Sequence, residues 1–469
     1  MRAAGHPFEV LTEAELETVH RNVLRVVAEV GLQVEHAGLL ERLAAAGGWV
    51  DRERQRVRYT ADQVEEFIAT SQCDPNGWPV GVSGSANLYY GHYLDPVTDE
   101  FLPLTVERAR AYFQVARALS HVKGCGILGC PLEGIPSALE PLYERYWAWR
   151  LGAHPGGSIH RVELCPALLE MYQVHAEAAG RPVGELFHAT VYLVPALRLG
   201  YQEAEQVAWF LERGLRVGIG TSMVTGGASG PATLAGMVTL AVAEGLLLGL
   251  VNRALFGERR WGIWMSATAM DFRTTMRPYG RPDMVLANLI GAQLARRYGT
   301  QFGGHCGLTD APRPSPQAAA QKMQSALATL LAGGRAHIEA GLLGVDEVFS
   351  PVQMALDNEL ISALEQFARE YEVSDEAIGA DVIAAVGPGG TYLAEEHTAR
   401  WFRREMWQPM LWDRYPFAAW QRLDGRTDIE RAREQVLAIL GEPPPPDGLS
   451  EDEERALRGI IERAARRSS

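Results

Sequence analysis

Two histidines and a glutamate carry the side chains best suited to proton transfer. His305 stands beside Cys306 near the end of one apolar run, and His337 and Glu339 belong to a second run. Imidazole and carboxylate groups act as general acids and bases, so one hypothesis is an enzyme with acid/base chemistry at these positions. They converge in space only if their positions on the strands agree. The local spacing of a zinc site is absent, and we predict no metal.

Aromatic residues point to a different chemistry. Trp264, Tyr279 and Phe302 lie in or near the same segments, and a Tyr-rich stretch covers residues 89–93. Aromatic rings together with a carboxylate are how proteins hold quaternary ammonium ions. A single ring more often serves packing, so the signal lies in the group of rings.

A glycine-rich loop at residues 226–230 precedes a long apolar helix. Its amides, with Gly227 and Ser229, could hold an anion at the start of that helix. The loop lacks the pattern of a phosphate-binding loop, so close packing of the helix is the competing interpretation. Ser229 does not stand in a GxSxG motif, which argues against a serine hydrolase.

The elements that must position these residues alternate between short apolar runs and helical patterns. This alternation is typical of βα units and predicts an α/β fold, a (β/α)8 TIM-type barrel over residues 111–360. We expect a mainly helical cap at 1–110 and a helical extension at 361–469 with a Pro-rich spacer at 442–446. The eight runs interpreted as strands are Val122–Pro131, Gly157–Val162, Ala189–Pro195, Val217–Val224, Gly262–Ala269, Gln301–Gly307, Ala336–Leu342 and Val348–Met354.

The composition narrows the partners and the compartment. The 469 residues include 44 Lys and Arg against 58 Asp and Glu, a net charge of −14, so a nucleic-acid partner is not expected. Five scattered cysteines and the lack of a signal-like start predict a cytoplasmic protein. The apolar stretch Leu234–Val251 carries Glu244 and small residues, which favours a buried helix or one facing a second copy in a homo-oligomer over a membrane span.

Several motifs in a fixed order resemble the trimethylamine methyltransferase family of corrinoid-protein methyltransferases, which includes glycine betaine methyltransferases. The resemblance covers roughly residues 10–440 and agrees with the barrel expected above. The motifs are Leu11–Leu16, Gly227–Gly236, Asp271–Thr274, Ala295–Gly299, Gly307–Ala311, Asp357–Glu359 and Val386–Gly390.

The resemblance implies methyl transfer from a methylated amine to cobalt(I) of a corrinoid that a separate protein carries, with no tightly bound cofactor on this chain. Trimethylamine-specific members carry pyrrolysine where Gly307 stands here. The chain therefore resembles the branch without pyrrolysine, which favours quaternary amines such as glycine betaine. We expect the missing side chain at residue 307 to leave room for this larger methyl donor.

The same resemblance suggests roles for the candidate residues. Gly307, Glu339 and His305 are the expected catalytic residues, and Glu339 or Asp310 would face the positive charge of the donor beside a ring such as Trp264. The expected substrate-binding residues are Trp264, Tyr279, Phe302, Asp310, His337, Arg161, Arg273, Gly227 and Ser229, the arginines and the loop for a carboxylate end. A non-catalytic amine-binding protein is the alternative. Glu339 departs from the family pattern, which has neutral residues in this segment.

Overall fold

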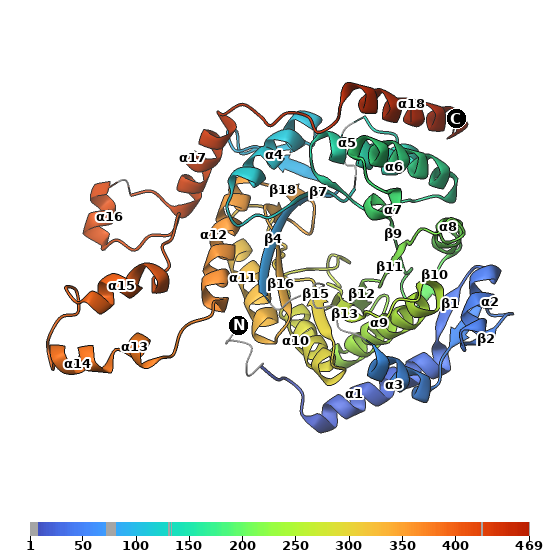
Figure 1. Ribbon diagram of the computed structural model, residues 1–469, viewed down its shortest axis with the longest axis horizontal. Coiled ribbons are helices and arrows are strands. Elements are labelled where there is room, and N and C mark those ends of the chain that lie inside the picture. The colour runs from blue at the N-terminus through green and yellow to red at the C-terminus, as the bar shows by residue number, and fades with distance from the viewer. Residues whose placement is uncertain (1–7, 72–80, 130–131, 133, 424, 469) are drawn as a thin grey trace.

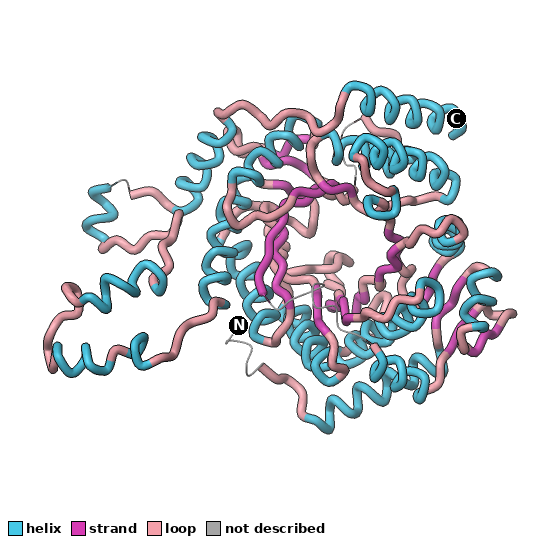
Figure 2. Tube along the Cα trace, in the orientation of Figure 1, coloured by secondary structure: helices cyan, strands magenta, loops and turns pink. Residues whose placement is uncertain are grey.

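A computed structural model of the chain describes residues 8–71, 81–129, 132, 134–423 and 425–468. The fold is mixed α/β, with strands arranged around a centre and helices outside them (Figure 1; Figure 2). The end of the expected run Val122–Pro131 lies outside the described residues.

The largest sheet is a curled sheet of six parallel strands. Neighbouring strands are hydrogen-bonded in the order β13-β15-β16-β4-β7-β8. Parallel strands of this kind need helical crossovers, which places helices on the outer face. The strands are β4 (Gly81–Leu88), β7 (Cys125–Ile127), β8 (His154–Pro155), β13 (Gly262–Met265), β15 (Gln301–Gly304) and β16 (Arg335–Glu339).

Two further parallel pairs continue the curve. β9 (Thr190–Tyr192) pairs with β11 (Gly218–Gly220), and β12 (Val224–Gly226) pairs with β14 (Ala267–Ala269). A backbone hydrogen bond connects the first pair to the segment after β8, since Thr190 N donates to Gly157 O at 2.8 Å. The second pair continues directly from β11 and β13 along the chain, and within it Val224 N donates to Ser266 O at 3.0 Å.

Long helices cover the outside of the strands (Figure 2). Most of them begin at a residue suited to a helix start, either a side-chain cap such as Thr233, Ser315 or Ser350, or a proline in the first turn. These helices are α4 (Val106–Ala118), α5 (Glu140–Arg150), α6 (Cys165–Ala179), α8 (Tyr201–Leu211), α9 (Leu234–Phe256), α10 (Pro282–Arg297), α11 (Pro316–Leu331) and α12 (Pro351–Ala368).

Three expectations about the strands are wrong. β4 lies within the segment for which we expected a helical cap, yet it stands between β16 and β7 in the parallel sheet. The run expected at Val348–Met354 holds only the short strand β18 (Val348–Phe349), which pairs with β17 (Leu342–Leu343) and β5 (His92–Leu94) outside the curled sheet. Pro351 then begins α12, since proline suits a first helical turn. The run Gly157–Val162 follows β8 rather than containing it.

The N-terminal segment packs beside α9. α1 (Glu13–Arg25) and α3 (Ala61–Thr70) both begin with capping boxes, at Thr12 and Thr60. The chain between these two helices forms α2 (Ala37–Ala45) and three strands, which a fourth strand from later in the chain completes to a small sheet in the order β10-β1-β3-β2. Its strands are β1 (Leu32–Val34), β2 (Trp49–Asp51), β3 (Arg56–Arg58) and β10 (Arg198–Leu199).

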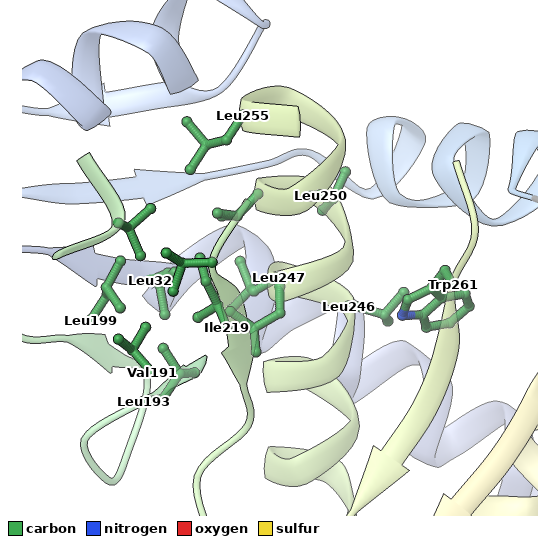
Figure 3. Packing of buried hydrophobic residues seen from close by; sticks show 14 of the residues in the cluster. Leu32, Val191, Leu193, Leu199, Ile219, Leu246, Leu247, Leu250, Leu255 and Trp261 are labelled. Atoms are coloured by element: carbon green, nitrogen blue, oxygen red, sulfur yellow. The ribbon is translucent and has the colours of Figure 1, made fainter. Parts of the chain in front are cut away.

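The long helix α9 forms the centre of the largest hydrophobic cluster. By length and composition it could cross a membrane, but 72% of its most apolar window is buried inside the protein. Leu246 lies beside Trp261, and Leu247 faces the strand residue Ile219 (Figure 3). The buried surface explains the apolar composition, and α9 is a core helix.

The C-terminal segment has two parts. Four short helices extend away from the body as an arm (Figure 1), and two longer helices return to it, α17 against α12 and α4, and α18 against α6 and α5. Glu359 of α12 accepts backbone N–H groups of Met410, Leu411 and Trp412, which ties the segment between α15 and α16 to the body. The helices are α13 (Asp375–Ile378), α14 (Ala380–Val386), α15 (Glu396–Glu405), α16 (Phe417–Leu423), α17 (Asp428–Leu440) and α18 (Glu451–Ser468).

Candidate active site between the parallel strands

A cavity of about 580 Å³ lies among the parallel strands and the loops at their carboxyl ends. Enzymes with parallel strands of this arrangement place their reacting groups at that end. The lining side chains that carry polar or aromatic groups are Tyr89, Ser158, His188, Thr190, Tyr192, Trp264, His305, Cys306, Arg335, His337, Glu339 and Asp346.

Two neighbouring strands supply a continuous row of polar side chains, which we call the β4–β16 ladder: Ser83, Ser85 and Asn87 of β4, and Arg335, His337 and Glu339 of β16. Alternate residues of a strand point to the same face, so each strand contributes every second residue. Backbone register pairs His337 with Ser83 and Glu339 with Ser85. The ladder therefore runs along one wall of the cavity.

Hydrogen bonds connect the members of the ladder. The His337 ring lies 2.9 Å from Ser83 Oγ through Nδ1 and 3.0 Å from Ser85 Oγ through Nε2. Asn87 Nδ2 donates to Glu339 Oε2 at 2.7 Å, and His337 Nε2 lies 3.3 Å from Glu339 Oε1. These contacts fix the position of the Glu339 carboxylate.

Glu339 is charged at neutral pH despite its environment. Burial acts to raise its pKa, but the hydrogen bond and charge of His337 and the bond from Asn87 outweigh burial and leave the pKa below the usual value. Among the described residues, the carboxylate has one short donor, Asn87, and its other oxygen has longer contacts, to His337 and to Tyr89 OH at 3.5 Å. It retains the capacity to face a cation.

A second carboxylate, Asp346, lines the same cavity. Tyr279 OH donates to Asp346 Oδ2 at 2.8 Å. Burial, together with the negative charge of Glu339, raises the pKa of Asp346 to about 6, against the lowering effect of the Tyr279 bond. A cation bound between the two carboxylates would relieve their repulsion.

His305 is a neutral group in this wall. Its Nδ1 lies 2.9 Å from Ser266 Oγ, and its ring meets Trp264 and Tyr279 edge to face, with ring centres 5.0 and 5.5 Å apart. Burial and the nearby guanidinium of Arg277 lower the pKa of His305 to about 4. The imidazole therefore carries no charge at neutral pH and holds the rings in place.

Cys306 also lines the cavity, but it is not a nucleophile at neutral pH. Burial raises the pKa of its thiol to about 11. A thiol rather than a thiolate is a poor nucleophile. The sulfur instead contacts the backbone of β16, accepting from His337 N at 3.2 Å.

A buried ion pair supports the end of β16. Lys322 Nζ donates to Asp357 Oδ2 at 2.6 Å and to the carbonyl of Glu339 at 2.9 Å, and both charged side chains are fully buried. Asp357 also accepts from Gly341 N at 2.8 Å. Asp357 of the Asp357–Glu359 motif thus anchors the backbone at the end of β16, next to Glu339.

The structure brings Trp264, His305, His337 and Glu339 to the cavity, and Tyr279 stands behind Asp346. Gly307 does not line it. Its φ of +66° suits glycine, and a Cβ there would lie 2.6 Å from His337 O and 2.7 Å from Ile338 Cα. Residue 307 lacks a side chain because it crosses the backbone of β16, so the expectation that it leaves room for a substrate is wrong.

The remaining predicted residues also lie elsewhere. Phe302 packs outward near Gly291 of α10 and Gly334. The Asp310 carboxylate accepts from the backbone N–H groups of Tyr279 and Gly280, at 2.6 and 2.9 Å, which fixes that loop. The other four belong to loops outside the cavity lining: Arg161, Arg273, Gly227 and Ser229.

Sequence reasoning missed several residues of the cavity lining, and it missed the β4 members of the β4–β16 ladder, which support that lining. Asp346 lies in a loop with no pattern to mark it, and both Val345 and Asp346 have positive φ, a conformation that sequence does not reveal at these residue types. Ser83, Ser85 and Asn87 alternate with small or apolar residues, which is a strand signal. Arg335 precedes His337 by two residues, so the same alternation could have found it. Within the described residues, no cluster of three or more His, Cys, Asp or Glu is arranged to hold a metal.

A curled parallel sheet with a polar, ring-lined cavity at the carboxyl ends of its strands is the place where α/β proteins typically bind a small molecule. The family is set by sequence: the model of the trimethylamine methyltransferase (MTTB) family matches residues 188–468, well over half of the chain. The chain belongs to this family of methyltransferases, as its motifs predicted.

Curated relatives extend the similarity beyond the matched region. The chain is 27% identical to a glycine betaine methyltransferase of Desulfitobacterium hafniense (strain Y51), over 92% of each chain. It is 25% identical to the trimethylamine methyltransferase MttB of Desulfitobacterium hafniense (strain DSM 10664 / DCB-2), over 98% of this chain and 95% of the relative. Among solved structures, the monomethylamine methyltransferase MtmB of Methanosarcina barkeri aligns with a TM-score of 0.45 at 11% identity, over 98% of this chain and 88% of that one.

Proposed function

We propose that this protein moves a methyl group from a quaternary or tertiary methylated amine to cobalt(I) of a corrinoid carried by a partner protein. One observation carries the proposal: the carboxylates of Glu339 and Asp346 and the ring of Trp264 line one cavity. Carboxylates and aromatic faces attract an alkylated ammonium ion, and a quaternary one depends on them because it has no N–H to donate. Membership of the methyltransferase family supports the reaction type.

The chemistry needs little proton transfer when the donor is a quaternary amine. The cobalt electron pair forms the new Co–CH3 bond while the C–N bond breaks, and its electron pair leaves with a neutral tertiary amine. No general acid is required, which agrees with a neutral His305 and a protonated Cys306 thiol. The protein contributes orientation and exclusion of water, effects worth several kcal/mol in bimolecular steps.

The two carboxylates act mainly in binding. The donor is cationic when it binds and loses its charge as the methyl group leaves. A carboxylate therefore stabilises the bound donor at least as strongly as the transition state and contributes to affinity more than to kcat. We assign Glu339 to binding of the ammonium group, in place of the catalytic role expected from the sequence.

We further propose that the strands complete a closed (β/α)8 barrel. The hydrogen bond from Thr190 to Gly157 supports closure, since it bridges the gap between β8 and β9. The chain itself joins β11 to β12 and β13 to β14, which connects the two parallel pairs to each other and to the curled sheet. β4, which stands between β16 and β7, then fills the place that we expected the run Val348–Met354 to fill as the eighth strand. The corrinoid protein would approach the carboxyl ends of the strands. The cytoplasmic location and the homo-oligomer stay predictions.

Incubation of the purified protein with cobalt(I) cobalamin and a panel of methylamines tests the proposal. We expect the absorption band of methylcobalamin to appear with one or more quaternary amines, together with an equal amount of the demethylated amine. Binding of an amine without methyl transfer to cobalamin or to any corrinoid protein would support the alternative, a non-catalytic binding protein. Absence of both binding and transfer with every quaternary or tertiary amine would refute both functions.

A further inference from the structure

A cationic side chain faces the cavity at the opposite end of the β4–β16 ladder from Glu339. Arg335 lines the cavity, and its Nε donates to Ser83 Oγ at 3.3 Å. Among the described residues, no carboxylate lies within 4.0 Å of its guanidinium, although most arginines of this chain have such a partner. A half-buried guanidinium without a carboxylate has N–H donors left for a ligand.

The ladder separates the charges along one axis. Arg335 is at the amino end of β16, His337 is in the middle and Glu339 is at the carboxyl end, with the side chains on one face. Arg335 bonds to Ser83, which is the register partner of His337, so the guanidinium reaches the level of His337. Two residues further along the strand, a rise of roughly 7 Å, stands Glu339.

We infer that Arg335 binds an anionic group of the methyl donor, so that the donor is a zwitterion with its ammonium beside Glu339 and Asp346. This inference rests on the proposed function and deepens it. The separation of the two charged ends favours a donor whose carboxylate lies several carbons from the nitrogen, such as a trimethylammonio group joined to a carboxylate by three methylenes. The exposed Arg161 and Arg273, expected in this role from the sequence, lie outside the cavity lining.

Guanidinium recognition of a carboxylate is directional. Arg presents parallel N–H groups to both carboxylate oxygens, whereas Lys offers a single point charge. Ser83 and His337, which contact each other at 2.9 Å, stand beside the guanidinium and orient it. The hydrogen bonds that orient Arg335 and those that position Glu339 therefore share Ser83 and His337.

Equilibrium binding by titration calorimetry on the full chain tests the inference with two probes of similar shape, 4-(trimethylammonio)butyrate and butyltrimethylammonium, which lacks the carboxylate. We expect the wild-type protein to bind the carboxylated probe at least tenfold more tightly. Arg335→Gln should abolish this preference and leave affinity for butyltrimethylammonium within about twofold. Arg335→Lys should keep part of the preference. The matched control Arg52→Gln, at an exposed arginine paired with Glu41, should keep all of it.

Two results would overturn the inference: equal binding of both probes by the wild-type protein, or an unchanged preference in a folded Arg335→Gln variant. Methyl transfer from butyltrimethylammonium to cobalt(I) cobalamin would then show that the proposed function stands without an anion-binding residue. No binding of either probe, and no transfer from any amine, would instead contradict the proposed function itself. Thermal unfolding of each variant establishes that it is folded.

Discussion

Two glutamates, Glu244 on α9 and Glu339 on β16, show how a carboxylate can be structural or available. Glu244 of α9 accepts from Leu197 N at 2.8 Å, from Ser222 N at 3.0 Å and from Ser222 Oγ, and it is fully buried. Glu339 of β16 has a single short donor and faces the cavity. Glu244 joins α9 to the loops that contain Leu197 and Ser222, whereas Glu339 has hydrogen-bonding capacity left for a ligand.

The electrostatics of the two carboxylates differ in the same sense. Burial raises the pKa of Glu244 even though backbone and side-chain donors act to lower it. The pKa of Glu339 lies below its usual value because His337 and Asn87 outweigh burial. The comparison teaches that a carboxylate away from solvent is not enough to identify a site. Glu339 differs from Glu244 because it faces a cavity and because the other members of the β4–β16 ladder hold it in position.

Removing the structural carboxylate should have the largest effect. Glu244→Ala leaves the backbone N–H groups of Leu197 and Ser222 buried without acceptors. We expect a loss of about 3 kcal/mol in the free energy of unfolding, measured by urea denaturation. Glu244→Gln keeps one acceptor oxygen and should lose less. Equal stability of Glu244→Ala and wild type would contradict the structural role.

Removing the cavity carboxylate should change binding and leave stability nearly intact. We expect Glu339→Gln to weaken binding of a quaternary amine by about 10- to 30-fold, the loss of one close charge interaction of about 2 kcal/mol. Because the donor loses its charge during transfer, kcat should fall much less than kcat/KM. Calorimetry and single-turnover kinetics measure the two effects. A variant that binds normally would remove Glu339 from its proposed role.

The pH dependence of stability should report Asp346. Its pKa is about 6 in the folded protein and about 3.8 when unfolded, so the folded state holds the proton more strongly between these values. The contribution of Asp346 to stability is therefore highest below pH 4 and falls as pH rises through 6, by about 2 kcal/mol between pH 4.5 and pH 7.5. Asp346→Asn should lose this slope and be more stable than wild type at pH 7.5, as urea unfolding at pH 4.5 and 7.5 would show. Parallel pH profiles would argue against the raised pKa.

Ligand binding should shift the same group. A bound cation favours the charged form of Asp346, so titration with a quaternary amine at pH 6 should release a fraction of a proton, and at pH 8 none. Calorimetry in buffers of different ionisation enthalpy measures this release. Identical proton release in wild type and Asp346→Asn would assign it to another group.

The smallest effect is expected at the glycine-rich loop. Ser229 Oγ accepts from Thr225 N at 2.9 Å within a surface turn outside the cavity lining. Ser229→Ala should cost at most about 1 kcal/mol of stability and change the affinity for quaternary amines less than twofold. A loss of affinity beyond tenfold, with the fold intact, would place the loop in the site after all.

The α/β architecture could be predicted from the sequence because most strands are apolar runs followed by helical patterns. β4 was missed because its inward face carries Ser83, Ser85 and Asn87, which make the segment too polar to read as a barrel strand. The false strand at Val348–Met354 arose because buried apolar residues look alike in a strand and at the start of α12.

The site was predicted in part for a similar reason. His305, His337, Glu339 and Trp264 were found because their residue types stand out on apolar strands, and the structure brings them to one cavity. The prediction for Gly307 was wrong because the sequence does not distinguish two reasons for a glycine. Here a positive φ and close backbone contact require glycine, whereas we expected it to leave space for a substrate. Asp310 was expected to face the substrate, but loop geometry, which has no period in the sequence, turns it to backbone N–H groups and brings Asp346 to the cavity instead.

Single-turnover methyl transfer is the most direct test of the claim that a methylated ammonium ion binds at Glu339 and gives its methyl group to cobalt(I). The rate of methylcobalamin formation is followed against donor concentration for wild type and Glu339→Gln. We predict saturable transfer by wild type and a half-saturation concentration raised at least tenfold in the variant. Superimposable concentration curves for the two proteins, or no methylcobalamin with any methylated amine, would contradict the account.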